Sequence, residues 1–451
     1  MRQMQLATTK MMFDELIDRH AEAYLEAYPE IVEFSSFERS GSNKKYIGMV
    51  WTNNFERPDT QQLKIRGSYS LTGNKLIELD LTKIDGQHTF FPGQIIAFQA
   101  EPFLKRQLTV KKLYDPIRIA PPTKRIDSED KMRLIIAAGP FMRAEQEDWC
   151  LYNKLIEQIK SNEATHVILM GPLVDLENKN SRLGFNEHWQ LITNRLTNEL
   201  HDLECRVYLV PSSRDILPSF LGSNYFHPCP QPTLNLKPTE SRVRSKCQIY
   251  GVGDPSQIDL GGMYLDVTSA EVLLHLNKCV SFINKGPGNL FTPLFRHLIS
   301  QGLYPIHPAP NDIAVDYPKL LKHIQLDRLG AHILVMPTRF NTVVANVENR
   351  VVVAVQKCSV KRHFVMIDIP KIESSQNIDS LVMADYTHKI IDLIPKKESA
   401  LASVGSQETE TDSIATTAPE ASEPLPSAPP IELQPSIEVG NGTNGHGAAD
   451  C

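Results

Sequence analysis

The spacing of hydrophobic residues changes along this chain and divides it into regions of different structure. From about Lys10 to Phe37, apolar residues recur at helical spacing until Pro29 interrupts them, which predicts one amphipathic helix. From about Lys44 to Tyr114 the spacing becomes two, and turn residues separate the apolar runs. This second pattern predicts five short strands at 47–51, 62–69, 75–81, 94–102 and 108–114.

Five short antiparallel strands within about 75 residues predict a small barrel. The oligonucleotide/oligosaccharide-binding (OB) fold is the commonest five-stranded barrel, and an SH3-like barrel is the alternative. A barrel face that binds nucleic acid needs aromatic side chains interleaved with lysines and arginines. Trp51, Lys64 and Arg66 are available for this and are the candidate nucleic-acid contacts. The other interpretation is that the barrel packs against protein.

After a charged linker at 124–131, strands alternate with helices, as is typical of a layered α/β domain. The runs 247–253 and 263–269 are expected to be strands that pair with each other through Gly261-Gly262. The pattern as a whole predicts two sheets packed face to face, with helices outside. The other predicted strands are 133–139, 165–170, 206–210, 332–336, 343–347, 351–355, 363–369 and 389–394, and the predicted helices are 145–159, 186–203, 270–276 and 290–300.

The composition predicts a disordered tail and indicates the type of cellular compartment. Beyond Pro395, Ser, Thr, Glu, Ala, Pro and Gly dominate and aromatic residues vanish, so this tail is expected to be disordered. The 7 scattered cysteines include no CxxC pair, which predicts a reduced compartment without a disulfide framework or structural zinc. No apolar run suits a membrane span, and no signal peptide is recognised. The net charge of -6 argues against sequence-independent DNA binding as the main task.

The turn after the strand at 165–170 is the first place to look for chemistry. In an open α/β sheet, ligands and catalytic groups lie at the carboxyl ends of the strands. Metallophosphoesterases place Gly-Asp-x-x-Asp in such a turn, and its first Asp bridges two metal ions. Here Pro172 stands in that place and has no ligand atom in its side chain, so the turn retains only Asp175.

The neighbouring strand ends lack the same chemistry. The first strand ends at Gly139 without a ligand, and a turn containing Arg339 replaces the late histidine turn. After the third strand, Arg214 lies near the expected imidazole and Asp215 alone persists. Two carboxylates cannot form a binuclear site, and the arginines would repel a cation. The sequence therefore predicts a non-catalytic protein with no metal, no cofactor and no catalytic residue; a divergent active metallophosphoesterase is the alternative.

Another aspartate stands in a turn that resembles a metal-ligand turn. Gly253-Asp254-Pro255 has the Gly-Asp order, yet it follows the wrong strand, and Pro255 indicates ordinary turn chemistry. No Gly-rich phosphate loop and no Gly-x-Ser-x-Gly elbow is present. These absences leave no competing catalytic motif.

Several motifs in this order resemble the family of B subunits of the DNA polymerase alpha–primase complex. The resemblance covers roughly Ser42 to Ile394. It implies an OB domain at 41–122 joined to an inactive calcineurin-like phosphoesterase domain at 123–395. A helical segment at 1–40 and an acidic, Pro-rich tail at 396–451 flank them. The motifs are FFPGQIIAFQAEP at 90–102, GPLVDL at 171–176, LVPSSRDI at 209–216, HPCPQP at 227–232, VTSAEVLLHL at 267–276, LISQGLYPIHP at 298–308 and HILVMPTRFN at 332–341.

The resemblance implies a nuclear, non-catalytic scaffold that holds the polymerase catalytic subunit through that subunit's zinc-binding C-terminal domain. Primase would join through the complex, and contact with DNA would be weak or indirect. A B subunit of polymerase delta or epsilon, or a single-stranded DNA-binding OB protein, is the alternative. The chain departs from the family in its tail, in the short stretch Met1–Ser40 before the barrel, and in the turn Gln356-Lys357-Cys358, where Asn-Pro-Gly is usual.

Overall fold

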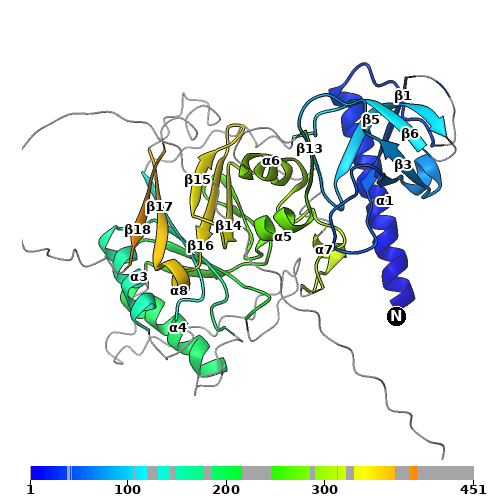
Figure 1. Ribbon diagram of the computed structural model, residues 1–451. Coiled ribbons are helices and arrows are strands. Elements are labelled where there is room, and N and C mark those ends of the chain that lie inside the picture. The colour runs from blue at the N-terminus through cyan, green and yellow to red at the C-terminus, as the bar shows by residue number, and fades with distance from the viewer. Residues whose placement is uncertain are drawn as a thin grey trace, which may run out of the picture. The chain divides into compact units, whose positions relative to one another are not determined.

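The computed structural model describes residues 2–37, 41, 43–104, 107–118, 131–142, 149–175, 185–215, 245–284, 290–311, 313–320, 330–370 and 386–393 (Figure 1). The predicted disordered tail, nearly all of the predicted linker and the HPCPQP motif lie outside these residues. Among the helices that are described, none is long and apolar enough to span a membrane.

Five strands close into a barrel in the N-terminal part of the chain, as the alternating pattern predicts. Around the barrel each strand is hydrogen-bonded to the next in the order β1-β2-β3-β6-β5. β3 and β6 are parallel, and the other neighbouring pairs are antiparallel. The barrel strands are β1 (Lys44–Val50), β2 (Leu63–Arg66), β3 (Leu76–Asp80), β5 (Ile95–Leu104) and β6 (Gln107–Leu113).

The predicted N-terminal helix, α1 (Arg2–Ala27), packs against the outside of this barrel. Side chains at helical spacing form its buried stripe, which meets the outward-facing residues of β1 and β5. Burial of such side chains stabilises a fold by roughly 1.5–3 kcal/mol each. The stripe is Phe13, Leu16, Ile17, Ala21 and Tyr24, and the barrel residues that it contacts include Ile47, Met49, Ile95 and Ala97.

Two sheets packed face to face form the rest of the described chain, as predicted. The first has the order β10-β9-β8-β7-β17-β18, and the second has the order β11-β12-β14-β16-β15. Their strands are β7 (Met132–Ala138), β8 (His166–Met170), β9 (Arg206–Val210), β10 (Gln248–Gly251), β11 (Ser256–Asp259), β12 (Tyr264–Val267), β14 (Ile333–Thr338), β15 (Val343–Asn346), β16 (Val351–Gln356), β17 (His363–Ile369) and β18 (Thr387–Asp392).

Helices cover the outer face of each sheet (Figure 1). In β7, Leu134 and Ile136 face the core between the sheets, whereas Ile135 and Ala137 face the helices. Both faces of the strand are therefore apolar, which explains its unbroken hydrophobic run. α3 (Cys150–Ser161) and α4 (Phe185–Leu200) cover the first sheet, α5 (Val272–Cys279) and α6 (Phe291–Gln301) cover the second, and α2 (Tyr69–Thr72), α7 (Tyr317–Leu320) and α8 (Cys358–Lys361) are single turns.

The expected pairing of the runs 247–253 and 263–269 is wrong. β10 instead lies parallel to β9, and β12 forms a hairpin with β11 through Gly261-Gly262. β11 reads Ser-Gln-Ile-Asp, and its single large apolar residue gives no strand signal. The three-residue strands β4 (His88–Phe90) and β13 (Ser281–Ile283) were not predicted either, because they are too short to show a period.

A two-stranded ribbon and a set of buried contacts join the barrel to the two-sheet region. We call these contacts the junction. β4 pairs with β13, and Phe91 is buried in the core beneath the second sheet. The side chain of Gln301, at the end of α6, accepts a hydrogen bond from Ile95 N and donates one to Ile95 O, both at 3.2 Å. At Gly93 (φ 92°) a Cβ would lie 2.6 Å from Pro305 O, so the backbones meet there without room for a side chain.

We expect Gln301→Leu to destabilise the fold by roughly 2–4 kcal/mol, because it leaves both backbone groups of Ile95 buried without their partner. The measurement is the urea midpoint of unfolding. Gln190→Leu, at an exposed position of α4, is the matched control and should change the stability by less than about 0.5 kcal/mol. Equal shifts in the two variants would show that the amide of Gln301 does not hold the junction.

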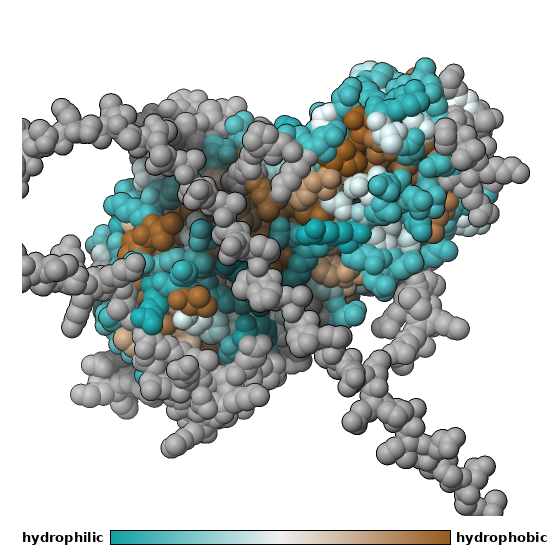
Figure 2. All heavy atoms as spheres, viewed as in Figure 1, coloured by the Kyte–Doolittle hydropathy of each residue, from teal (hydrophilic) through white to brown (hydrophobic). Residues whose placement is uncertain are grey.

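On the face shown in Figure 2, the surface of the described residues is mainly hydrophilic. In the view of Figure 2, hydrophobic residues form separate patches, one of which lies over the barrel. The exposed large hydrophobic residues are Met11, Val32, Tyr69, Leu76, Tyr250, Val360 and Ile390. Apart from Tyr69 and Leu76 they are far apart in the sequence, and no two of them share a helix or strand.

Candidate functional site

A cavity of about 520 Å³ lies where the carboxyl ends of strands from both sheets meet. We call it the strand-end cavity. It lies at the strand-end turns that were singled out in the sequence. The residues that line it follow β7, β8 and β9 or stand at the ends of β14 and β16, and they are Pro140, Phe141, Met142, Leu173, Asp175, Arg214, Thr338, Arg339, Gln356, Lys357, Ser359 and Val360.

Asp215 joins the turn after β9 to the turn after β8. Its Oδ1 accepts hydrogen bonds from Leu173 N at 2.6 Å and Val174 N at 2.8 Å. Its Oδ2 accepts a third from Ser212 N at 2.8 Å. Burial raises the pKa of this carboxyl to about 6, while the three backbone N–H groups act in the opposite direction. Both oxygens of Asp215 are therefore committed to the backbone of these turns.

The other charged groups around the cavity form ion pairs with one another. Arg214 donates from Nη2 to both carboxylate oxygens of Asp175, at 3.1 and 2.9 Å. Glu271, directly before α5, accepts from Arg339 Nε at 2.5 Å and also pairs with Lys357. Asp175 and Glu271 are largely buried, so each carboxylate is stabilised by the cations beside it.

The structure brings the six turn residues singled out in the sequence to one place. Asp175, Arg214 and Arg339 line the cavity, and Asp215 lies directly behind it. The backbones of Gly139 and Pro172 lie against each other, so close that a Cβ on Gly139 would be 2.2 Å from Pro172 O.

Two further members of this site, Glu271 and Lys357, were not predicted from the sequence. The unusual turn at Lys357 was a usable signal, because it departs from the family pattern at the end of a buried strand. Nothing in the local sequence marks Glu271, so only the fold shows that it belongs here.

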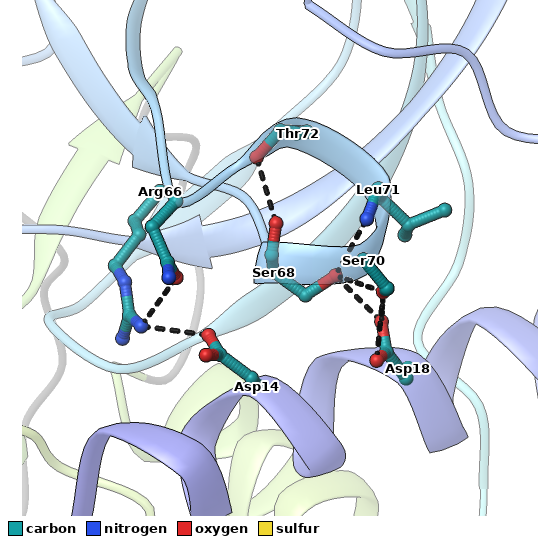
Figure 3. Close-up of polar contacts among 8 residues, drawn as sticks. Asp14, Asp18, Arg66, Ser68, Ser70, Leu71 and Thr72 are labelled. Carbon is teal, nitrogen blue, oxygen red and sulfur yellow. Dashed lines mark hydrogen bonds and ion pairs between the residues drawn. The ribbon is translucent and has the colours of Figure 1, made fainter. Parts of the chain in front are cut away.

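The three candidate nucleic-acid contacts lie on the barrel, in a different part of the molecule. Arg66 is buried and donates from Nη2 to Asp14 of α1 and to Asn74, both at 2.7 Å (Figure 3). Its guanidinium also lies 5.7 Å from the centre of the Trp51 ring. Lys64 is exposed. Contact of these residues with nucleic acid stays a prediction, and Arg66 is buried and already paired with Asp14.

A second contact fixes α1 beside this pair. Asp18 accepts hydrogen bonds from Ser68 at 2.5 Å and from Ser70 at 2.7 and 2.8 Å (Figure 3). Ser68 also caps α2 by accepting from Leu71 N. Burial raises the pKa of Asp14 and lowers the pKa of Arg66, so both partners of the neighbouring pair bear a desolvation cost. These polar contacts position a helix that its apolar stripe already holds.

Residues 134–341 match the family model of the DNA polymerase alpha/epsilon B subunit. The matched residues include most of β7, all of β8, β9 and β14, and the turns that follow these four strands. This region of the chain is similar to that family. We call residues 134–341 the B-subunit region.

Curated relatives agree with this assignment at low identity. The DNA polymerase alpha B subunit of Mus musculus is 22% identical over 291 residues, covering 62% of this chain and 46% of the relative. The Drosophila melanogaster protein of the same name is 27% identical over 260 residues, covering 55% and 39%. The Schizosaccharomyces pombe protein is 23% identical over 286 residues, covering 58% and 47%. The chain thus spans about half the length of the curated relatives that it matches.

Two solved structures are similar to part of the chain. An archaeal phosphodiesterase is 11% identical with a TM-score of 0.26, covering 58% of this chain and 100% of its own. Vacuolar protein sorting 29 from Cryptosporidium parvum is 10% identical with a TM-score of 0.28, covering 58% and 98%. With TM-scores this low, neither likeness supports a statement about function.

We expect Gly171→Ala in the B-subunit region to lower stability by about 1–3 kcal/mol, as overpacking of a closed site does. The added Cβ would lie 2.6 Å from Asp215 Oδ2 and 2.9 Å from Ser212 N, so it would push apart the groups that join the two turns. Thermal unfolding measures the effect. Ser213→Ala changes an exposed residue of the same turn and should leave the melting temperature unchanged. An unchanged melting temperature in Gly171→Ala would contradict the close approach.

A second buried carboxylate, Asp254, has only neutral partners. Its Oδ1 accepts hydrogen bonds from Thr268 Oγ1 at 2.7 Å and Ser269 N at 3.1 Å, and its Oδ2 accepts from Ser269 Oγ at 2.5 Å. Burial raises the pKa of Asp254 to about 6. This arrangement gives the residue a structural role in joining the turn before β11 to the end of β12.

The raised pKa of Asp254 predicts a pH dependence of stability. The carboxyl ionises near 3.8 when unfolded but near 6 when folded, so its stabilising contribution is present below about pH 4 and lost as the pH rises through 6. Asp254→Asn keeps the acceptor for Thr268 and does not titrate. We expect the stability of the native protein minus that of the variant to fall by roughly 2–3 kcal/mol between pH 4 and 7. Urea unfolding at each pH measures this difference, and a difference independent of pH would contradict the assignment.

Proposed function

We propose that this chain is a non-catalytic accessory subunit of the DNA polymerase alpha–primase complex. It would hold the catalytic subunit while the complex makes RNA–DNA primers at the initiation of replication, in the nucleus. The observation that carries this proposal is the family match of residues 134–341, a region that contains the turns after β7, β8, β9 and β14. The mouse, fly and fission yeast relatives are all named for polymerase alpha, which favours alpha over delta or epsilon.

The side chains of the strand-end cavity that could bind a metal support the non-catalytic assignment. A binuclear metal site needs several free carboxylates and imidazoles around two cations. Here Asp215 binds backbone N–H groups with both oxygens, and Asp175 is paired with Arg214. Among the described residues, no group of three or more His, Cys, Asp or Glu is arranged to hold a metal ion. The residues present therefore do not fit the metal pair of a phosphoesterase, and we derive no catalytic step from this site.

The topology supports the proposed architecture, an OB barrel joined to an inactive calcineurin-like phosphoesterase domain. In chain order the barrel strands run 1-2-3-5-4, with one parallel pair, which is the arrangement of an OB barrel. Two packed sheets with helices outside suit the second domain. We place the boundary between the two domains at residues 122 and 123.

A broad partner surface formed by both domains suits an obligate complex, because a large stable contact needs more area than one small barrel supplies. We propose that the catalytic subunit docks there with its zinc-binding C-terminal domain, and that primase joins through the complex. The junction supports this idea, since it fixes the barrel to the second domain through paired strands and buried hydrogen bonds. Contact with DNA would be weak or indirect.

Purification of the tagged full-length chain from a nuclear extract of its source organism tests this proposal. We expect the polymerase alpha catalytic subunit and the primase subunits at equal stoichiometry with the tagged protein, identified by mass spectrometry. An untagged extract is the control. Recovery of the delta or epsilon catalytic subunit would move the assignment to that polymerase, and recovery of no polymerase or primase subunit would refute it.

The non-catalytic assignment has a separate test. We expect no hydrolysis of a phosphodiester substrate by the purified protein with added manganese, compared with Asp175→Ala under the same conditions. Activity above that of Asp175→Ala would show that the cavity performs metal chemistry after all.

A further inference from the structure

The strand-end cavity has more positive than negative charge on its walls. Three cations line it, Arg214, Arg339 and Lys357, against one lining carboxylate, Asp175. Glu271 lies behind the wall and pairs with Arg339 and Lys357. The four charged groups that line the cavity sum to a net positive charge, which attracts an anionic ligand, and Glu271 and Asp215 lie behind the wall.

Arg339 is the cation best placed to bind such a ligand. Its side chain is 62% exposed, and its ion pair with Glu271 uses Nε. A guanidinium carries five N–H donors, so the Nη groups of Arg339 can bind a second carboxylate while Nε keeps Glu271. Lys357 is only 13% exposed and contributes mainly through its charge.

The backbone of this site does not suit phosphate. Phosphate-binding turns use several backbone N–H groups that point at the ligand. In the turns after β8 and β9, the N–H groups of Leu173, Val174 and Ser212 already bind Asp215. Recognition of an anion must therefore come from side chains. An arginine side chain binds a carboxylate through its N–H donors.

Apolar residues on the walls indicate what carries the carboxylate. Phe141, Met142 and Leu173 form the apolar part of the lining, and Val360 stands 66% exposed beside it. A cavity lined by both cations and apolar side chains complements a peptide in which acidic and apolar residues alternate. Its volume of about 520 Å³ is sufficient for a few side chains and not for a folded domain.

We propose that the strand-end cavity is a docking site for an acidic peptide segment of a partner protein, whose carboxylate binds Arg339 and whose apolar side chain contacts Phe141 and Val360. The site does not depend on which polymerase complex contains the protein. It would convert a position that carries metal chemistry in phosphoesterases into a protein-binding position.

Fluorescence anisotropy with the full-length protein tests the proposal. The probe is a fluorescein-labelled peptide of Glu-Leu-Ala repeats, and the same peptide with Gln in place of Glu is the neutral control. We expect binding of the acidic peptide that weakens as salt is raised, and at least about tenfold weaker binding of the neutral peptide.

Three variants locate the binding. Arg339→Gln should weaken the acidic peptide about fivefold or more, as loss of one charged contact does. Arg296→Gln is the matched control, because Arg296 is 59% exposed and also pairs through Nε with a largely buried glutamate, Glu348, but lies outside the cavity. It should leave binding unchanged. Asp175→Asn removes the negative charge of the lining carboxylate and should tighten binding. A variant that only damaged the fold would weaken binding instead.

Equal binding by the native protein, Arg339→Gln and Asp175→Asn would overturn the proposal. So would equal affinity for the acidic and neutral peptides, or displacement of the peptide by ATP or inorganic phosphate at concentrations where free glutamate has no effect. Melting temperatures of all variants show whether each is folded. None of these outcomes bears on co-purification with the polymerase, so this proposal and the proposed function can fail separately.

Discussion

The buried carboxylate of Asp215 determines what the turns around the strand-end cavity can do. A carboxylate removed from water needs a compensating partner, and three backbone N–H groups provide it here. The two turns are thereby held close enough that Gly171 cannot carry a side chain. The same commitment removes Asp215 as a cation ligand and leaves Arg214 to pair with Asp175. The closeness of the turns after β8 and β9 follows from this one residue.

Much of the architecture could be predicted from the sequence because most of its strands are apolar or alternating runs with clear periods. The five barrel strands, both helices over the first sheet and the strands β14 to β17 follow from spacing alone. The failures have a common physical cause. β4, β11 and β13 are three or four residues long, and tertiary contacts rather than local pattern hold them in place. Without β11, β12 lacked its true partner and was paired with β10 by proximity in the sequence.

The candidate site shows the same limit in chemical terms. The turns after β7, β8 and β9 could be found because each follows a recognisable buried strand. Glu271 could not, because an isolated glutamate before a helix is indistinguishable from a surface residue until the fold places Arg339 and Lys357 beside it. Arg66 illustrates a different limit of the sequence. A basic residue next to an aromatic one on a barrel suggests nucleic acid, whereas here its first partner is a carboxylate of α1.

The ribbon of β4 and β13 has a consequence for how the chain is made. Phe90 pairs with Ser281, about 190 positions later, so the barrel leaves the ribosome long before its partner strand is synthesised. During that interval the edge of β4 and the ring of Phe91 are uncovered. A nascent chain in this state presents an unpaired edge and an apolar side chain together, the combination that molecular chaperones bind. The pairing of β4 with β13 therefore also determines which surface of the nascent chain stays uncovered until residues 281–283 are made.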